Sequence, residues 1–178
     1  MAMHANPDWR LALVESFADL FRPGDDARRA AGWPSCGDGW REILERLCGR
    51  IRSSIGPKDS VVLDRVREKF GVLRVDWSGE VSGVAGQAVM QAVDLATARS
   101  ACTCENCGAE GRLHRHRGWL ATRCADHAAG DPVPPRFGIV GTRAYRRRRG
   151  HREIYYARYD RANDALIEVP PRRLGTED

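Results

Sequence analysis

Two closely spaced pairs of potential metal ligands lie in the middle of this 178-residue chain. Cys104 and Cys107 are separated by two residues; sixteen residues later come Cys124 and His127, again separated by two. Each pair can hold one ion from a single turn, and two such pairs complete a tetrahedron around Zn²⁺. The spacing therefore predicts a zinc site with Cys104, Cys107, Cys124 and His127 as its ligands.

All four positions around such an ion would be filled by protein side chains. A catalytic zinc ion usually keeps three protein ligands and leaves one position open for water. We therefore expect a structural Zn²⁺ that replaces the hydrophobic core which so short a segment cannot build. The competing interpretation, reduced cysteines without any metal, is less compatible with four ligands at these intervals.

The residues around the ligands follow the order of a treble-clef zinc finger. Gly108 comes directly after Cys107 and can take the positive φ that the knuckle between the first two ligands needs. Residues 112–117 and 119–124 are predicted as two short strands, and a short helix is expected to begin at Asp126. Many functions use this scaffold, so it does not name one.

Three neighbouring side chains could compete for the metal or form a second site. Cys102 lies close to the first pair, but we interpret it as a bystander thiol because Cys104 and Cys107 have the usual knuckle spacing. His114 and His116 share one face of a predicted strand, since side chains on a strand alternate between its faces. A second metal site and a catalytic pair are the alternatives there; we favour solvated histidines interleaved with arginines.

Hydrophobic periodicity in the first hundred residues predicts an α/β unit. Apolar residues recur at helical spacing over 9–21, and again in an unbroken stripe from Trp40 to Ile55 that includes Cys48. We interpret Trp40 and Cys48 as core residues, not as ligands.

A hairpin and a third helix are predicted after these two helices. Residues 60–68 and 72–77 are rich in β-branched side chains and flank Gly71, which suits a tight antiparallel turn. Residues 80–100 carry small apolar side chains at helical spacing and are expected to pack closely against the sheet. The predicted order is therefore helix, helix, strand, strand, helix and zinc unit.

Composition narrows the class of protein. Apolar residues make up 42% of the chain, enough for a hydrophobic core, but no run of about eighteen of them occurs and a membrane span is not expected. The N-terminus lacks the basic and apolar order of a signal peptide. Three of the six cysteines are assigned to the metal and the others have no obvious disulfide partners, so we expect a reducing cytoplasm.

Four motifs occur together between about residues 38 and 128. They are GWREIL at 39–44, VREKFGVLR at 66–74, ARSACTCENCGA at 98–109 and GWLATRCADH at 118–127. In combination they resemble a group of small, uncharacterised zinc-finger proteins of bacteria and their phages. The resemblance implies a zinc-binding unit and no established activity. Val72 departs from the group's pattern, which often has a second glycine in the Lys-Phe-Gly turn.

The last part of the chain is expected to be an added β structure. Residues 130–135 contain three prolines and predict an extended linker. Segments 136–145, 153–160 and 166–169 are predicted strands. Four consecutive arginines are predicted to lie in the loop between the first two of these strands: Arg146, Arg147, Arg148 and Arg149.

The positive charge of the chain is concentrated in this extension. Residues 136–178 contain 11 Lys and Arg against 6 Asp and Glu, whereas residues 1–101 and 102–135 are each balanced. Guanidinium groups suit bidentate phosphate contacts, and tyrosines on a strand can stack on bases. The candidate contacts with nucleic acid or another partner are Arg146, Arg147, Arg148, Arg149, Arg152 and Tyr155.

We interpret the chain as a non-enzymatic, zinc-containing module that binds nucleic acid through this basic hairpin. An acidic protein surface is the alternative partner, as in an adaptor or a phage-encoded inhibitor of a host defence complex. A third hypothesis is a metal-dependent nuclease in which His114 or His116 activates water, although the sequence offers no paired carboxylates and no second metal-binding set. The remaining alternative is that the extension has no specific partner. In that case the arginines form a solvated loop tip and the tyrosines are half-buried core residues.

The predicted fold class is α+β, with helices packed on a small antiparallel sheet. The predicted divisions are an α/β core at 1–101, a zinc-binding unit at 102–129, the linker at 130–135 and a basic β-hairpin or meander at 136–178. The zinc unit is expected to be a treble clef embedded between the core and the extension.

Overall fold

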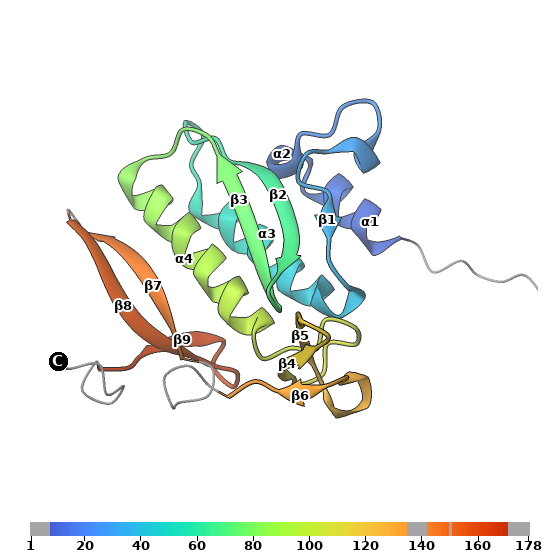
Figure 1. Cartoon of the computed structure of the whole chain (residues 1–178). Coiled ribbons are helices and arrows are strands. Elements are labelled where there is room, and N and C mark those ends of the chain that lie inside the picture. The colour runs from blue at the N-terminus through green and yellow to red at the C-terminus, as the bar shows by residue number, and fades with distance from the viewer. Residues whose placement is uncertain (1–7, 135–141, 150, 171–178) are drawn as a thin grey trace, which may run out of the picture.

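The computed structural model describes residues 8–134, 142–149 and 151–170, with the backbone alone for 142–149 and 151–153. Its helices are α1 (Trp9–Ser16), α2 (Ala18–Phe21), α3 (Arg41–Ser54) and α4 (Gly83–Ser100), with the 3₁₀ turns η1 (Ala27–Arg29), η2 (Asp38–Trp40) and η3 (Ala125–His127). Its strands are β1 (Pro34–Ser35), β2 (Val62–Lys69), β3 (Val72–Ser78), β4 (Arg112–His116), β5 (Trp119–Arg123), β6 (Asp131–Pro132), β7 (Thr142–Arg149), β8 (His151–Asp160) and β9 (Ala165–Glu168). The fold class is α+β, as predicted (Figure 1).

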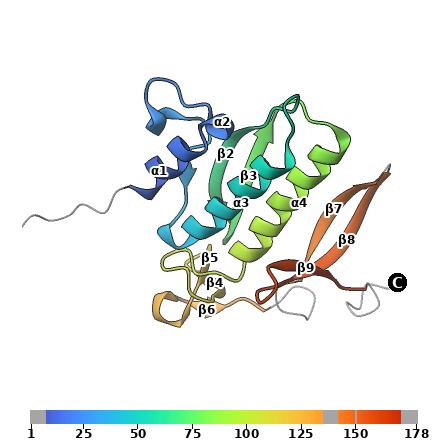
Figure 2. The ribbon, with the colours of Figure 1, turned by 180° about the vertical axis from the view of Figure 1, so that it is seen from behind.

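The strands form three small sheets, in the orders β1–β2–β3, β5–β4–β6 and β7–β8–β9. Their pairings are antiparallel, apart from the parallel pairing of β1 with β2. Helices α3 and α4 cover one face of the first sheet, as Figures 1 and 2 show from opposite sides. The second sheet lies at one end of this layer, and the third lies beside α4.

The hydrophobic core lies between the first sheet and its two helices. Trp40 and Cys48 are fully buried there, which confirms their prediction as core residues. Burial raises the pKa of the Cys48 thiol to about 12, so this cysteine stays a neutral packing side chain. Other buried residues of this core are Ile43, Leu44, Leu47, Ile51, Leu63, Val66, Leu73, Val89, Ala92 and Ala96.

The predicted helix over 9–21 is two helices in the structure. At Phe17 the backbone leaves the helical region, with φ −120° and ψ 39°, and α2 follows. The break brings Leu20 and Phe21 into the core, while Phe17 stays partly exposed under the Arg52 guanidinium, 4.2 Å from its ring centre. Burial of two large side chains therefore outweighs a continuous helical pattern.

The predicted hairpin is formed by β2 and β3, which turn through Phe70 and Gly71. Both residues have positive φ, 55° and 79°, as a two-residue type I′ turn requires. A Cβ on Gly71 would overlap the Leu113 side chain, and the Gly71 carbonyl oxygen accepts a hydrogen bond of 2.6 Å from the Thr122 hydroxyl. This turn therefore joins the core to the second sheet.

The predicted zinc unit has a small sheet of its own. β4 pairs with β5, and the two strands turn through Arg117 and Gly118, both with positive φ. η3 follows β5, so a helical turn comes after the hairpin as expected. The predicted helix from Asp126 through the following alanines is wrong, because the turn ends at His127 and Ala128 has an extended backbone. The assignment of this unit as a treble clef stays a prediction. Part of the predicted linker is a strand, because Asp131 and Pro132 form β6 and pair with β4.

The third sheet packs against α4. Ala157 of β8 and Ala98 of α4 are both buried, and Tyr155, Tyr159 and Leu166 pack around them. These two small side chains allow a strand and a helix to approach closely.

The placement of the arginine tetrad in a loop is wrong. Arg146–Arg149 belong to β7, opposite residues 151–154 of β8. Continued ladder pairing gives the backbone N–H and C=O groups of these residues partners that a loop would leave to water.

Candidate metal centre

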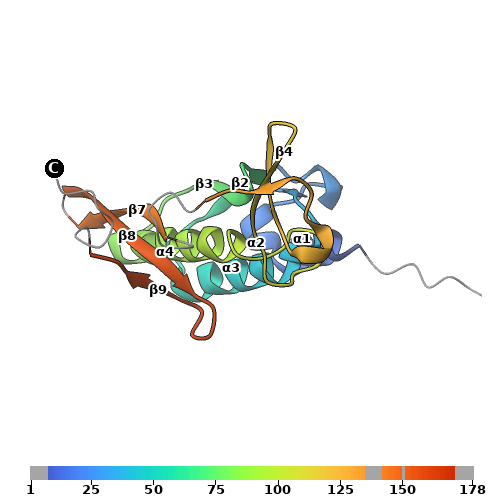
Figure 3. The ribbon, with the colours of Figure 1, turned by 60° about the horizontal axis from the view of Figure 1, so that its bottom comes forward.

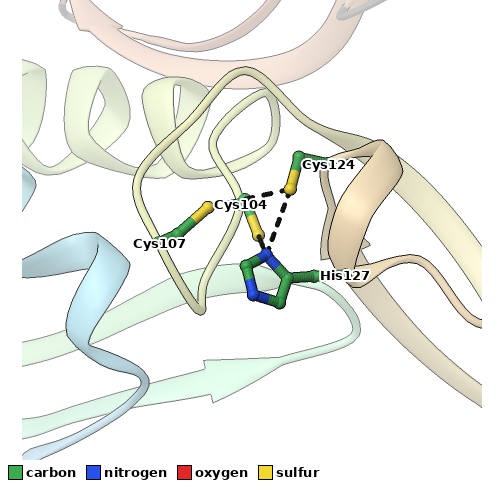
Figure 4. Close-up of side chains that lie close together, drawn as sticks. All are labelled: Cys104, Cys107, Cys124 and His127. Atoms are coloured by element: carbon green, nitrogen blue, oxygen red, sulfur yellow. Dashed lines mark hydrogen bonds between the residues drawn. The ribbon is translucent and has the colours of Figure 1, made fainter.

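The four predicted ligands come together in the structure. Their ligand atoms all lie within 4.8 Å of one another, and among the described residues no other group of three or more His, Cys, Asp or Glu is gathered in this way. Cys104 and Cys107 come from the knuckle that follows α4 (Figure 4). Cys124 and His127 come from the end of β5 and from η3. Two segments that are separate in the sequence thus build one site.

Three separations between the ligand atoms lie within a few tenths of an ångström of those around a tetrahedral ion, and all of the separations fall within 4.8 Å. With bonds of about 2.3 Å to sulfur and about 2.0 Å to nitrogen, a tetrahedral Zn²⁺ holds its ligand atoms roughly 3.5–3.8 Å apart. The sulfurs of Cys107 and Cys124 are 3.7 Å apart. His127 Nδ1 lies 3.8 Å from the Cys104 sulfur and 3.2 Å from the Cys124 sulfur. The ring therefore presents Nδ1 as its ligand atom.

The environment of Cys104 favours its thiolate. Burial opposes ionisation, but backbone N–H groups of Cys124, Cys107 and Asn106 donate to the sulfur and lower the pKa of this thiol to about 6. The Ala109 N–H acts on Cys107 in the same sense, yet desolvation and the neighbouring sulfurs of Cys124 and Cys104 raise the pKa of Cys107 overall. Thiolates this close repel one another until a cation neutralises them, so the cluster suits a thiophilic divalent ion.

The turn before α3 holds the knuckle against the core. The Gly39 N–H donates to the Glu105 carbonyl oxygen at 2.8 Å. A Cβ on Gly39 would overlap the Cys104 carbonyl oxygen and the Gly108 nitrogen, so only glycine fits this approach. Gly108 has a φ of 79°, as predicted for the knuckle. Gly39 is therefore the residue at which the turn before α3 contacts the metal-binding knuckle.

Side chains complete this junction. The Glu105 carboxylate accepts hydrogen bonds from the Gly37 N–H at 3.0 Å and from the Arg123 guanidinium at 2.8 Å. The Trp40 indole N–H donates to the Thr103 carbonyl oxygen at 2.9 Å, and this bond is buried. The knuckle is thus tied both to the core and to β5, which leads into the second ligand pair.

The neighbouring thiol and histidines have separate positions. Cys102 lies outside the cluster, as expected, with its sulfur 3.3 Å from the Arg99 carbonyl oxygen. His116 is exposed, as predicted. The prediction of a solvated His114 is wrong, because its side chain is 5% exposed and its Nδ1 lies 3.0 Å from the Arg112 carbonyl oxygen. β4, which carries both histidines, is the central strand of its sheet and pairs with β5 and β6.

The structure places the predicted partner contacts on β7 and β8. For Arg146–Arg149 and Arg152 the structure gives strand positions and register, with Arg148 opposite Arg152, and their side chains lie outside the described residues. Tyr155 is half-buried in the cluster on α4, so its ring packs on the molecule. Tyr159 is also half-buried, and its hydroxyl donates to Asp164 Oδ1 at 2.5 Å.

Two features of this region were not found from the sequence. Trp119, at the start of β5, is 81% exposed, and its place directly after the turn residue Gly118 was the only signal. Arg161, between β8 and β9, donates to the Cys102 carbonyl oxygen at 3.2 Å and to the Thr103 hydroxyl at 3.1 Å. No local pattern could predict this contact between the extension and the knuckle.

The chain matches no family model, and no curated protein or solved structure is detectably similar to it. Among the described residues, no helix combines the length and the apolar character that crossing a bilayer would require. All six cysteines lie in the described part of the chain and are free. The site's chemistry therefore has to be argued from its own geometry.

Proposed function

We propose that the chain is a zinc-containing module in which Zn²⁺ has a structural role. The observation that carries this proposal is the convergence of three sulfurs and one imidazole nitrogen within 4.8 Å. Such a donor set, with every tetrahedral position filled by protein, is that of structural zinc sites. In this proposal Cys104, Cys107, Cys124 and His127 hold the ion, and the ion links the knuckle to η3.

Elemental analysis of the purified chain tests the metal. About one equivalent of zinc is expected per chain. Cys107→Ser should lose most of it, because one thiolate ligand is removed, whereas Cys102→Ser should keep it as a matched cysteine variant outside the cluster. Equal metal content in both variants, or none in the unaltered chain, would refute the assignment.

We further propose that the module binds nucleic acid through the sheet formed by β7, β8 and β9. Support comes from the excess of 11 Lys and Arg over 6 Asp and Glu in residues 136–178. Register places Arg146 opposite Ile154, and alternation puts both on the sheet face away from Ala157 and α4. Ile154 and Arg158 on that face are exposed. Binding of this kind follows the phosphate backbone and weakens steeply with salt.

Fluorescence anisotropy with labelled DNA and RNA at two salt concentrations tests this proposal. Replacing Arg146, Arg147, Arg148 and Arg149 by glutamine should weaken binding and lower its salt dependence. The matched control replaces four exposed arginines elsewhere, namely Arg28, Arg29, Arg65 and Arg74. Both variants lose the same charge, so equal effects would show that position is irrelevant and contradict a site on the third sheet.

An acidic protein partner is the second candidate, and one observation favours it. Ile154 and Ile167 are 62% and 38% exposed, and register with Arg158 places Ile167 on the same sheet face as Ile154. Exposed apolar side chains beside arginines are typical of protein interfaces. Recovery of one stoichiometric partner after nuclease treatment would favour this adaptor or inhibitor role. Membership of the bacterial and phage zinc-finger group remains a proposal based on the four motifs.

A further inference from the structure

The β4–β5 hairpin has one docked face and one open face. Leu113 and Thr122 are opposite each other in the register, and both contact the Gly71 turn of the core. The next positions along each strand point the other way, which places His116 and Trp119 together on the opposite face. The hairpin tip projects beyond the α/β layers, as Figure 3 shows. This face is therefore open at the hairpin tip, whereas His114 farther along β4 is buried.

A groove of about 370 Å³ lies on this open face and reaches the metal site. Its volume falls at the lower end of clefts that take small ligands, about 300–1,000 Å³. Aromatic, cationic and imidazole groups dominate its lining: His114, His116, Arg117, Trp119, Arg123 and His127. The proposed ligand His127 is thus shared between the cluster and the groove.

Trp119 is an unusual residue to find at a groove rim. Its side chain is 81% exposed, whereas Trp9 and Trp40 are 8% and 0% exposed. An indole face left in water forgoes the burial free energy that a large aromatic side chain normally gains on folding. Trp119 lines the groove, so a planar ligand bound there can cover the exposed indole face.

The lining of the groove includes two arginines and no acidic side chain, which suits an anionic ligand. Residues 112–123 contain four arginines and no Asp or Glu. Of these, Arg117 and Arg123 line the groove; Arg123 is paired with Glu105, and Arg117 is exposed. Arg115 alternates onto the docked face with Leu113. A planar ring beside an exposed guanidinium group can recognise a base and its phosphate, by stacking and by charge-assisted hydrogen bonds.

We propose that this groove binds single-stranded nucleic acid, with one base stacked on Trp119 and an adjoining phosphate held by Arg117. This inference rests on the proposed nucleic-acid function and adds a second contact surface, distinct from β7–β9. A single strand is favoured over a duplex because a paired base has both faces covered and cannot stack on an indole. His127 belongs to both sites, so a metal bound by the cluster would fix one side chain of the groove lining.

Anisotropy of a labelled oligothymidylate of about 12 nucleotides, with the metal-loaded full chain, tests the groove. Trp119→Ala should weaken binding by roughly tenfold or more, whereas Trp119→Phe should retain most of it because a phenyl ring still stacks. Val84→Ala is the control, since Val84 is 82% exposed on α4, away from the groove. Binding to Trp119→Ala as tight as to the unaltered chain overturns the inference.

Further arms separate this inference from the proposed function. If Trp119→Ala still binds the oligonucleotide and the variant lacking Arg146–Arg149 does not, the groove inference is refuted. The proposal of binding through β7–β9 then stands. Loss in Trp119→Ala alone supports the groove and locates binding away from β7–β9. Competition with polyglutamate tests whether charge alone is recognised. If polyglutamate displaces the oligonucleotide at equal charge concentration, base stacking on Trp119 is refuted. Absence of any binding by the unaltered chain removes both proposals.

Discussion

Gly39 shows how one missing side chain can determine a metal site. The residue has no unusual backbone conformation, so its value lies in the absence of a Cβ. Its N–H reaches the Glu105 carbonyl oxygen at 2.8 Å only because the two backbones pack directly together. Any larger residue would push the knuckle away from the turn that precedes α3, and with it the first two ligands.

Gly39→Ala is therefore expected to destabilise the fold by roughly 2–4 kcal/mol and to weaken metal binding. The overlap is with backbone atoms, the Cys104 carbonyl oxygen and the Gly108 nitrogen, which cannot rotate aside. Gly49→Ala is the matched control, because a Cβ at this exposed position in α3 would meet no atom within 4 Å. It should stabilise the chain by up to about 1 kcal/mol. Urea unfolding and zinc titration of both variants make the comparison, and equal effects would exclude a role for the close approach.

At the scale of elements, one carboxylate fastens the third sheet to the two main helices. Asp164, in the turn between β8 and β9, pairs with Arg46 at 3.1 Å and Arg50 at 2.6 Å on α3, and with Arg99 at 3.4 Å on α4. Burial opposes ionisation, but the hydrogen bonds from Tyr159 and Arg50 and the charges of Arg50 and Arg99 lower the Asp164 pKa to about 2.

A lowered pKa in the folded state predicts a definite pH dependence. The stabilisation by Asp164 is complete above its unfolded pKa of about 3.9 and is lost as the pH falls towards 2. Asp164→Asn should therefore cost about 2 kcal/mol at pH 7 and progressively less below pH 4. Asparagine tolerates the positive φ of 48° at this position, so the substitution removes charge and leaves the turn.

Acid also releases metal from thiolates, but it does so equally in the unaltered chain and in Asp164→Asn. The difference in unfolding free energy between the unaltered chain and Asp164→Asn, measured by urea from pH 7 to pH 3, isolates the ion pairs. Asp25→Asn, at an exposed loop position, is the control and should change little at any pH. A difference that stays constant over this range would contradict the assignment.

Local patterns explain what could be predicted. The ligand spacing is a property of two short turns, so Cys104, Cys107, Cys124 and His127 could be identified without knowing the fold. The partners of Asp164 on α3 lie 114 and 118 residues away, and no local rule relates them. The arginine tetrad was misplaced for a similar reason, because a run of like charges has no period and only pairing with β8 makes it a strand.

At the scale of the whole molecule, the knuckle is the point where all parts of the chain meet. The core reaches it through Gly37, Gly39 and Trp40, and the extension reaches it through Arg161. The Thr122 hydroxyl joins β5 to the Gly71 turn, and β5 leads into the second ligand pair. The motifs at 39–44, 66–74, 98–109 and 118–127 therefore mark the surfaces at which the metal unit joins the core.

Removal of the metal should consequently loosen the molecule from this junction outward. In native-state hydrogen exchange with a chelator, the amides of Gly39, Glu105 and Gly108 should lose protection first, since each donates to a backbone carbonyl at the junction. Amides of the β2–β3 pairing around Val66 and Val75 should exchange more slowly, because the hydrophobic core beneath them contains no metal ligand. A uniform loss of protection would mean that the ion supports the entire core directly, and unchanged exchange at Gly39 would mean that no metal holds the knuckle. The graded order is expected because the ion fixes two short loops, whereas the apolar layer between the first sheet, α3 and α4 is stabilised by its own burial.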